Sequence, residues 1–214
     1  MDAPRSRHPF LASVITTEAE LDERYGQPVP AAVAKEVPVV NDDYRRFIEA
    51  SPFVLLATAG PEGLDCSPRG DRGGVVRVHD ERTLLLPDRR GNNRVDSLRN
   101  IVHDPRVGLL FLVPGVGETL RVNGRAALCT DDGLRDSFAV DGKLPSCVIV
   151  VDVEAVYIQC PKALVRSGLW DPDGYVERSS LPSMGEILQH ITEGGFDGAA
   201  FDAAYPERLR ATIY

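Results

Sequence analysis

The chain has 214 residues and a formal net charge of -8, with 43% apolar and 26% charged residues. This composition is typical of a soluble globular protein with enough apolar material for one sizeable core. The acidic balance argues against broad nucleic-acid binding, and no apolar run approaches the roughly 20 residues of a membrane-spanning helix.

Neither secretion nor metal binding is indicated by the sequence. The first residues lack the apolar segment of a secretion signal, so we expect a cytoplasmic protein. Cysteines occur at Cys66, Cys129, Cys147 and Cys160, without a Cys-x-x-Cys pair or a histidine at ligand spacing. We therefore expect no metal site and no disulfide framework, and we interpret the cysteines as reduced packing residues.

The N-terminal part reads as an arm. Residues 1–15 show no helical periodicity, and Thr17 with Glu20 forms a capping-box pattern for a short helix that stops at Gly26. Three prolines between residues 28 and 38 then predict an extended connector. Asn41 is expected to cap a helix over 42–50 that plugs one end of a small barrel.

Strand signals dominate the middle of the chain. We expect strands over residues 53–59, 65–69, 75–79, 83–86, 106–113, 118–128 and 146–159. The run 106–113 is continuously apolar, which predicts burial on both faces or at a subunit interface. Short helices are expected from residue 131 to about 140 and after a capping box formed by Ser183 and Glu186. The last residues, 196–214, are expected to dock on the barrel or on a partner.

Arginine is concentrated between residues 66 and 106. This segment has nine arginines and six acidic residues, so it carries +3 while the remainder carries -11. Arginine favours bidentate contacts with phosphate or carboxylate groups, which suits a small anionic ligand. The alternative is that these arginines are solvated strand and turn residues.

The segment 87–94 has the strongest chemical signal. Pro87 ends a strand, Gly91 permits a positive φ, and Asn92 or Asn93 can cap a helix that continues to His103. The helix N-terminus and Arg94 would then converge on one point, an arrangement that binds phosphate. The alternative is an ordinary capped helix with exposed charges.

The only tryptophan follows a second basic segment. Trp170 lies close in sequence to Lys162 and Arg166. It either stacks on a planar anionic ligand or anchors the tail by packing.

Several motifs, in this order and spacing, resemble the flavin-binding split-barrel family related to pyridoxamine 5'-phosphate oxidase. The resemblance covers about residues 40 to 172. The segments that carry it are Ser67–Asp71 (SPRGD), Leu86–Arg89 (LPDR), Gly91–Arg94 (GNNR), Asp104–Phe111 (DPRVGLLF), Leu120–Gly124 (LRVNG), Cys160–Ala163 (CPKA) and Leu169–Pro172 (LWDP).

The resemblance implies a fold that is mainly β with flanking helices: a homodimer of six-stranded split β-barrels with two FMN molecules at the subunit interface. It divides the chain into an arm with a short helix (1–40), the FMN-binding domain (41–172) and a helical extension (173–214). By the same resemblance, Arg69 meets the FMN phosphate with Ser67 beside it.

Further cofactor contacts follow from the resemblance. The edge of the isoalloxazine ring is lined by Leu86, Pro87 and Asp88. The phosphate and ribityl chain are held by Asn92, Asn93 and Arg94. Arg166 and Trp170 approach the flavin from the other subunit.

The chain departs from the vitamin B6 oxidases of this family at its end. Residues 206–214 lack the histidine of the substrate-clamping motif, which puts vitamin B6 oxidation in doubt. We expect an FMN-dependent oxidoreductase acting on an unidentified small molecule, with NAD(P)H or oxygen as redox partner and no identified catalytic residue. A deazaflavin in place of FMN is a variant. The alternative is a non-enzymatic flavin-binding or haem-binding protein with a sensing role.

Overall fold

The computed structural model describes residues 13–214, which fall into two compact units, one ending at Lys35 and one comprising Glu36–Tyr214. The first unit contains α1 (Glu18–Tyr25), whose capping box of Thr17 and Glu20 is confirmed. It also contains α2 (Pro30–Ala34), so the extended connector predicted here is wrong. Pro30 occupies the first helical turn, where its fixed φ favours a helix. The arm predicted for residues 1–12 lies outside the described residues.

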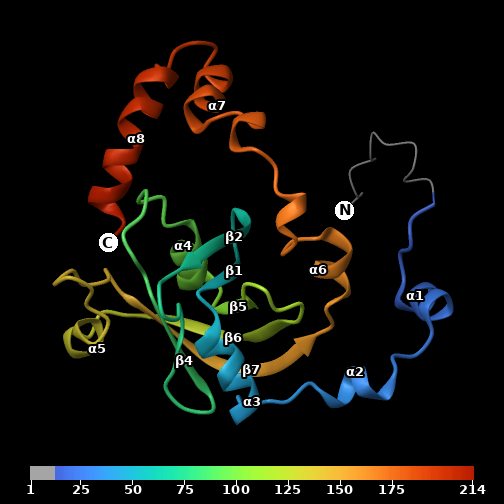
Figure 1. The fold of residues 1–214 in the computed structure, drawn as a ribbon. Coiled ribbons are helices and arrows are strands. Elements are labelled where there is room, and N and C mark those ends of the chain that lie inside the picture. The colour runs from blue at the N-terminus through green and yellow to red at the C-terminus, as the bar shows by residue number, and fades with distance from the viewer. Residues whose placement is uncertain (1–12) are drawn as a thin grey trace. The chain divides into compact units, whose positions relative to one another are not determined.

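The second unit is built on one antiparallel sheet, so the prediction of a mainly β fold with flanking helices is confirmed (Figure 1). The strand order is β2-β1-β5-β6-β7-β4-β3, and the sheet is open rather than closed. It has seven strands, as the strand signals in the sequence predict, instead of the six that the resemblance implies; the two-residue β3 forms the expected hairpin with β4. The strands are β1 (Phe53–Gly60), β2 (Gly63–Gly70), β3 (Arg77–Val78), β4 (Thr83–Pro87), β5 (Arg106–Leu112), β6 (Thr119–Cys129) and β7 (Val148–Gln159).

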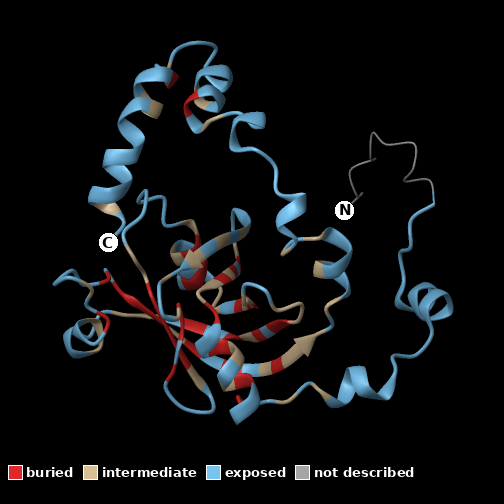
Figure 2. Ribbon diagram, viewed as in Figure 1, coloured by how far each residue is buried: buried red, intermediate tan, exposed pale blue. Residues whose placement is uncertain are grey.

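The main core cluster lies on one face of this sheet (Figure 2), and a smaller cluster of Leu85, Phe138 and Val148 lies on the other, because Leu85 alternates with Leu84 and Leu86 along β4. In β5, Val107, Leu109 and Phe111 are buried, whereas the alternate residues are only half-buried. The expectation that this strand is buried on both faces is therefore wrong for the single chain, because its side chains alternate between the two sides of the sheet. Whether a second subunit covers the other face stays a prediction.

Helices flank the sheet. They are α3 (Asp42–Ala50), α4 (Asp96–His103), α5 (Asp132–Asp136), α6 (Lys162–Ser167), α7 (Met184–Ile191) and α8 (Gly198–Thr212), with short 3-10 turns at Pro172–Gly174 and Arg178–Ser180. The Oδ1 of Asn41 accepts from the N–H of Tyr44, as expected for the cap of α3. None of the described helices combines the length and apolar character needed to cross a membrane.

Helix α4 packs directly on β1. The amide of Asn100 donates to the hydroxyl of Thr58 at 3.1 Å, and both side chains are buried. A Cβ at Gly60 would lie 2.1 Å from Oδ1 of Asn100, so this strand position needs glycine. Because this contact fixes α4 against β1, it also fixes the point at which the loop from β4 to α4 ends.

The helical extension is a pair of helices. The capping box of Ser183 and Glu186 at the start of α7 is confirmed. α8, which contains Pro206 in its interior, covers residues that the sequence analysis expected only to dock on the barrel or on a partner. The two helices approach closely at Gly185 and Gly198, where an added Cβ would clash with backbone atoms. The boundaries predicted at residues 41–172 and 173–214 stay predictions.

Candidate functional site

A cavity of about 450 Å³ lies between β2 and the loop that joins β4 to α4. We call it the arginine cavity. Its volume is within the usual range of roughly 300–1,000 Å³ for small-molecule sites. Its polar lining comes from Ser67, Arg69, Asp88, Arg89, Arg90, Asn92, Asn93 and Ser146. Three arginines against one aspartate make this lining positive overall.

Arg69 projects from β2 across this cavity. Its Nη1 donates to Oδ1 of Asp88 at 2.6 Å, and its Nε donates to Oγ of Ser67 at 3.3 Å. The Arg69 and Asp88 side chains are only 19% and 13% exposed. Asp88 is fixed in turn, because its N–H donates to the Cys147 carbonyl at 2.9 Å. The guanidinium is thus held in one orientation at the end of β4.

Ser67 connects the cavity to the first turn of α4. Its hydroxyl lies 2.8 Å from that of Ser97, and the Ser97 hydroxyl donates to the carboxylate of Asp65. Because a carboxylate only accepts, Ser97 donates to Asp65 and Ser67 donates to Ser97. Sequence reasoning missed Asp65 and Ser97. The signal that points to Asp65 is its spacing from Ser67 and Arg69, which places all three on one face of β2.

The loop before α4 differs from the prediction. The N-cap residue is Val95, with φ 53° and no side-chain cap, so the expected capping by Asn92 or Asn93 is wrong. Oδ1 of Asn92 instead accepts from the N–H of Arg94 at 3.1 Å, and Asn93 has φ 62°. The positive φ values of this loop fall on Asn93 and Val95 rather than on Gly91. Asparagine tolerates the left-handed region, whereas valine does not adopt it without steric cost.

Of the predicted site residues, the arginine cavity brings together Ser67, Arg69, Asp88, Asn92 and Asn93. Others lie outside it. Leu86 is fully buried in the core, and Pro87 lines a smaller neighbouring cavity. Arg166 is exposed on α6, and Trp170 donates from Nε1 to the Val116 carbonyl at 2.8 Å, in agreement with a packing anchor. Neither lines the arginine cavity of the single chain.

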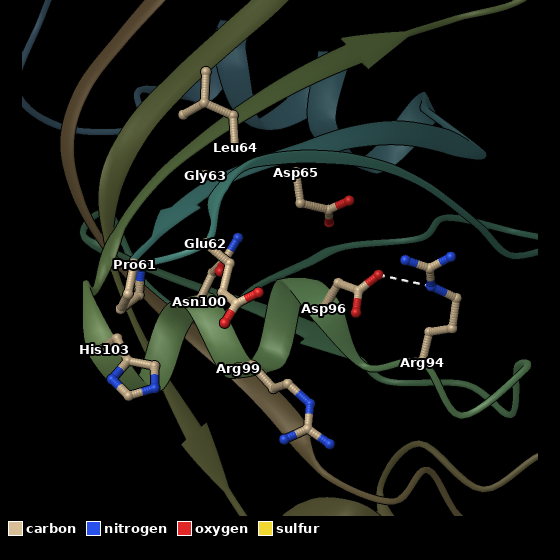
Figure 3. Close-up of a pocket in the computed structure, with 10 residues that line it drawn as sticks. All are labelled: Pro61, Glu62, Gly63, Leu64, Asp65, Arg94, Asp96, Arg99, Asn100 and His103. Atoms are coloured by element: carbon tan, nitrogen blue, oxygen red, sulfur yellow. Dashed lines mark hydrogen bonds and ion pairs between the residues drawn. The ribbon is translucent and has the colours of Figure 1, made fainter.

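Arg94 lines a different cavity. This hairpin cavity of about 870 Å³ lies between the β1–β2 turn and α4 (Figure 3). Nε of Arg94 donates to Oδ2 of Asp96 at 2.8 Å, and the side chain is 76% exposed. Although this cavity is larger, its charged lining mixes acids and bases, so the arginine cavity is better suited to an anion.

The smaller neighbouring cavity, of about 240 Å³, shares Arg69, Arg89 and Arg90 with the arginine cavity. We call it the tail cavity because Ile213 also lines it. Arg89 pairs with Asp71, whereas Arg90 is exposed and has no ion pair within residues 13–214. Sequence reasoning did not assign Arg89 or Arg90 to the site, although the arginine count of this segment includes both.

A family model described as pyridoxamine 5'-phosphate oxidase matches residues 40–160. No curated protein sequence matches.

Solved structures match at low identity. HupZ of Group A Streptococcus is 16% identical, with 55% of this chain and 91% of that chain covered and a TM-score of 0.46. A candidate pyridoxamine 5'-phosphate oxidase from Listeria innocua is 20% identical, with 55% and 95% covered and a TM-score of 0.41. Another from Lactobacillus delbrueckii is also 20% identical, with 56% and 99% covered and a TM-score of 0.41.

Proposed function

Because the chain belongs to the pyridoxamine 5'-phosphate oxidase family, we propose that it is an FMN-dependent oxidoreductase that acts on a small molecule. The family resemblance expected from the sequence motifs is thereby confirmed, whereas the cofactor and the reaction are inferences. The observation that carries them is the arginine cavity, in which guanidinium and amide groups from two separate segments, β2 and the loop that joins β4 to α4, line one space.

The residues of this cavity fit the phosphate end of FMN. Arg90 has a guanidinium without an ion-pair partner in the described chain, and Arg69 has donor capacity beyond its bond to Asp88. Side-chain amides of Asn92 and Asn93 line the same space. These groups supply charge-assisted hydrogen bonds of the kind that bind phosphate strongly.

The chain's own residues would position the cofactor rather than perform acid–base chemistry. Bound FMN supplies hydride or electron transfer, and the protein orients it and excludes competing reactions. Asp88, held by Arg69, is the carboxylate of the lining and would accept hydrogen bonds from the ring edge of bound FMN. We also retain the proposal that a homodimer completes the site, with Trp170 and Arg166 contributed from the second subunit.

A non-enzymatic flavin-binding protein with a sensing role would use the same cavity. Haem fits it less well, because the described residues that line the cavity include no histidine, cysteine, methionine or tyrosine to bind the iron. Reduction of the bound flavin by NAD(P)H, followed as bleaching of its absorbance, would favour the enzyme. A flavin that NAD(P)H and oxygen leave unchanged would favour the sensing role.

The phosphate site is tested with Arg90→Ala. Loss of one charge-assisted hydrogen bond costs about 1.5–3 kcal/mol, so we expect FMN to bind roughly 10- to 100-fold more weakly. Arg90 is exposed and unpaired, so folding should be unaffected. Binding is measured by equilibrium dialysis with FMN.

The matched control is Arg99→Ala. Arg99 is also an exposed arginine, but it lines the hairpin cavity instead. We expect it to bind FMN as the wild type does. Equal affinities of the Arg90 and Arg99 variants would refute the proposed phosphate site.

A further inference from the structure

The last residues of the chain return to the candidate site. After α8 ends at Thr212, the hydroxyl of Tyr214 donates to Oδ1 of Asp71 at 2.7 Å. Asp71 directly follows β2, the strand that carries Ser67 and Arg69. The tail is thus tied to the strand that lines the arginine cavity.

Asp71 joins the tail to an arginine of the cavity. While Oδ1 of Asp71 accepts from Tyr214, its Oδ2 accepts from Nε of Arg89 at 2.8 Å and lies 2.7 Å from Nη2. The Asp71 side chain is only 7% exposed and that of Arg89 is 18% exposed, so solvent screens this pair weakly. The hydrogen bond to Asp71 also raises the pKa of the Tyr214 phenol, which keeps it a donor.

Arg89 is held on its other side as well. Its Nη1 donates to the Phe138 carbonyl, just beyond α5, at 2.6 Å. The guanidinium also lies over the Tyr214 ring, with 5.5 Å between Cζ and the ring centroid. Arg89 is therefore fixed by contacts from three separate segments, and its backbone is part of the loop that lines the cavity.

Arg89 lies in the loop between β4 and α4, next to the residues that line the arginine cavity. Asp88, which pairs with Arg69, precedes it, and the unpaired Arg90 follows. Asn92 and Asn93 follow three and four residues after Arg89 in the same loop. Because Arg89 is fixed, residues 88–93 of this loop can adopt fewer backbone conformations, and these residues include the side chains that line the arginine cavity.

We propose that Tyr214 is a positioning residue of the candidate site: through Asp71 it holds Arg89, and thereby keeps residues 88–93 in the conformation that binds the anion. This inference rests on the proposed function. It assigns to the helical extension a part in ligand binding that lies beyond the segment matched by the family model, residues 40–160.

The test compares Tyr214→Phe with the wild type. The variant keeps the ring over Arg89 and removes only the hydroxyl. We expect the Kd for FMN to rise about 5- to 10-fold, while the Kd for riboflavin, which lacks the phosphate, changes less than twofold. If the tail only stabilised the fold, the Tyr214→Phe substitution would raise the Kd values of FMN and riboflavin by the same factor or would leave both unchanged.

A second readout does not depend on flavin. Amide hydrogen exchange in the cofactor-free protein should become about tenfold faster at residues 89–93 in Tyr214→Phe. Tyr205→Phe is the matched control, because it removes a hydroxyl from α8 without touching this loop, and it should change neither readout.

Unchanged exchange at residues 89–93 would overturn the role of Tyr214. Failure of the wild type to bind FMN would refute the proposed function instead, and the exchange measurement would still decide the role of Tyr214 in holding the loop.

Discussion

Cys147 lies beside the arginine cavity and has an unusual environment for a thiol. It is buried, and its carbonyl accepts from the N–H of Asp88. Burial, and after it the Asp88 carboxylate, raise the pKa of the thiol from its ordinary 9.0 to about 11, against the opposing effect of Arg69. The expectation that all four cysteines are packing residues holds for Cys147, but Cys66 and Cys160 are exposed.

This difference predicts selective thiol chemistry. At pH 8, Cys66 and Cys160 should be alkylated within minutes in the folded protein, whereas Cys147 should react only after unfolding, because the thiolate is the reactive form. Peptide mapping by mass spectrometry distinguishes the sites. Alkylation of Cys147 in folded protein as fast as that of Cys66 would contradict the assigned burial.

The same shift gives a pH dependence of stability. The folded protein holds the Cys147 proton more tightly than the unfolded chain does, since the folded pKa is the higher one. The stabilisation of the folded protein by the protonated Cys147 thiol is therefore fully present below about pH 9 and is lost as the pH rises to about 11.

The positions of individual site residues were predictable where they depend only on neighbouring residues, as in the alternation of side chains along a strand. The alternation of β2 places Ser67 and Arg69 on one face, and the structure puts both on the arginine cavity. Arg94 lines the hairpin cavity instead, in a loop with positive φ values at Asn93 and Val95 that the sequence pattern does not predict.

At the scale of elements, α4 begins under strain. Val95 is β-branched, yet it occupies the left-handed region immediately before Asp96. For a residue with a Cβ this conformation costs roughly 1–2 kcal/mol. Such strain persists where the surroundings enforce it, and it is frequent at functional sites.

Relief of this strain is measurable. Val95→Gly should raise the free energy of unfolding by about 1 kcal/mol, because glycine adopts a positive φ without steric cost. Val95→Ala retains the Cβ and should give little of this gain. Urea denaturation provides both values, and destabilisation by the glycine variant would show that Val95 is not strained.

The elements with local signals were predicted well. The caps of α1, α3 and α7 and the positions of the strands follow from capping residues and from alternation. α2 was missed because the prolines between residues 28 and 38 predicted an extended connector, although Pro30 occupies a first turn, which accepts proline. No separate helix was predicted over α8, which contains Pro206 in its interior.

For the whole molecule, the candidate site lies at an edge of the open sheet. β2 is the terminal strand, and it carries Ser67 and Arg69. Leu64, near the start of this strand, is 89% accessible. Edge strands are normally paired, covered or charged, so a second subunit at this edge is consistent with the proposed homodimer. The order of the sequence motifs predicted the family. A single sequence does not show which chain segment or subunit packs against the edge strand β2.

The most direct test of the account compares FMN with riboflavin in equilibrium dialysis against the wild-type protein. We predict saturable binding of one FMN per chain and binding of riboflavin at least about 100-fold weaker, because the phosphate makes two or more charge-assisted hydrogen bonds of roughly 1.5–3 kcal/mol each. Equal affinity for the two ligands, or no saturable binding of FMN, would contradict a phosphate-binding role for the arginine cavity.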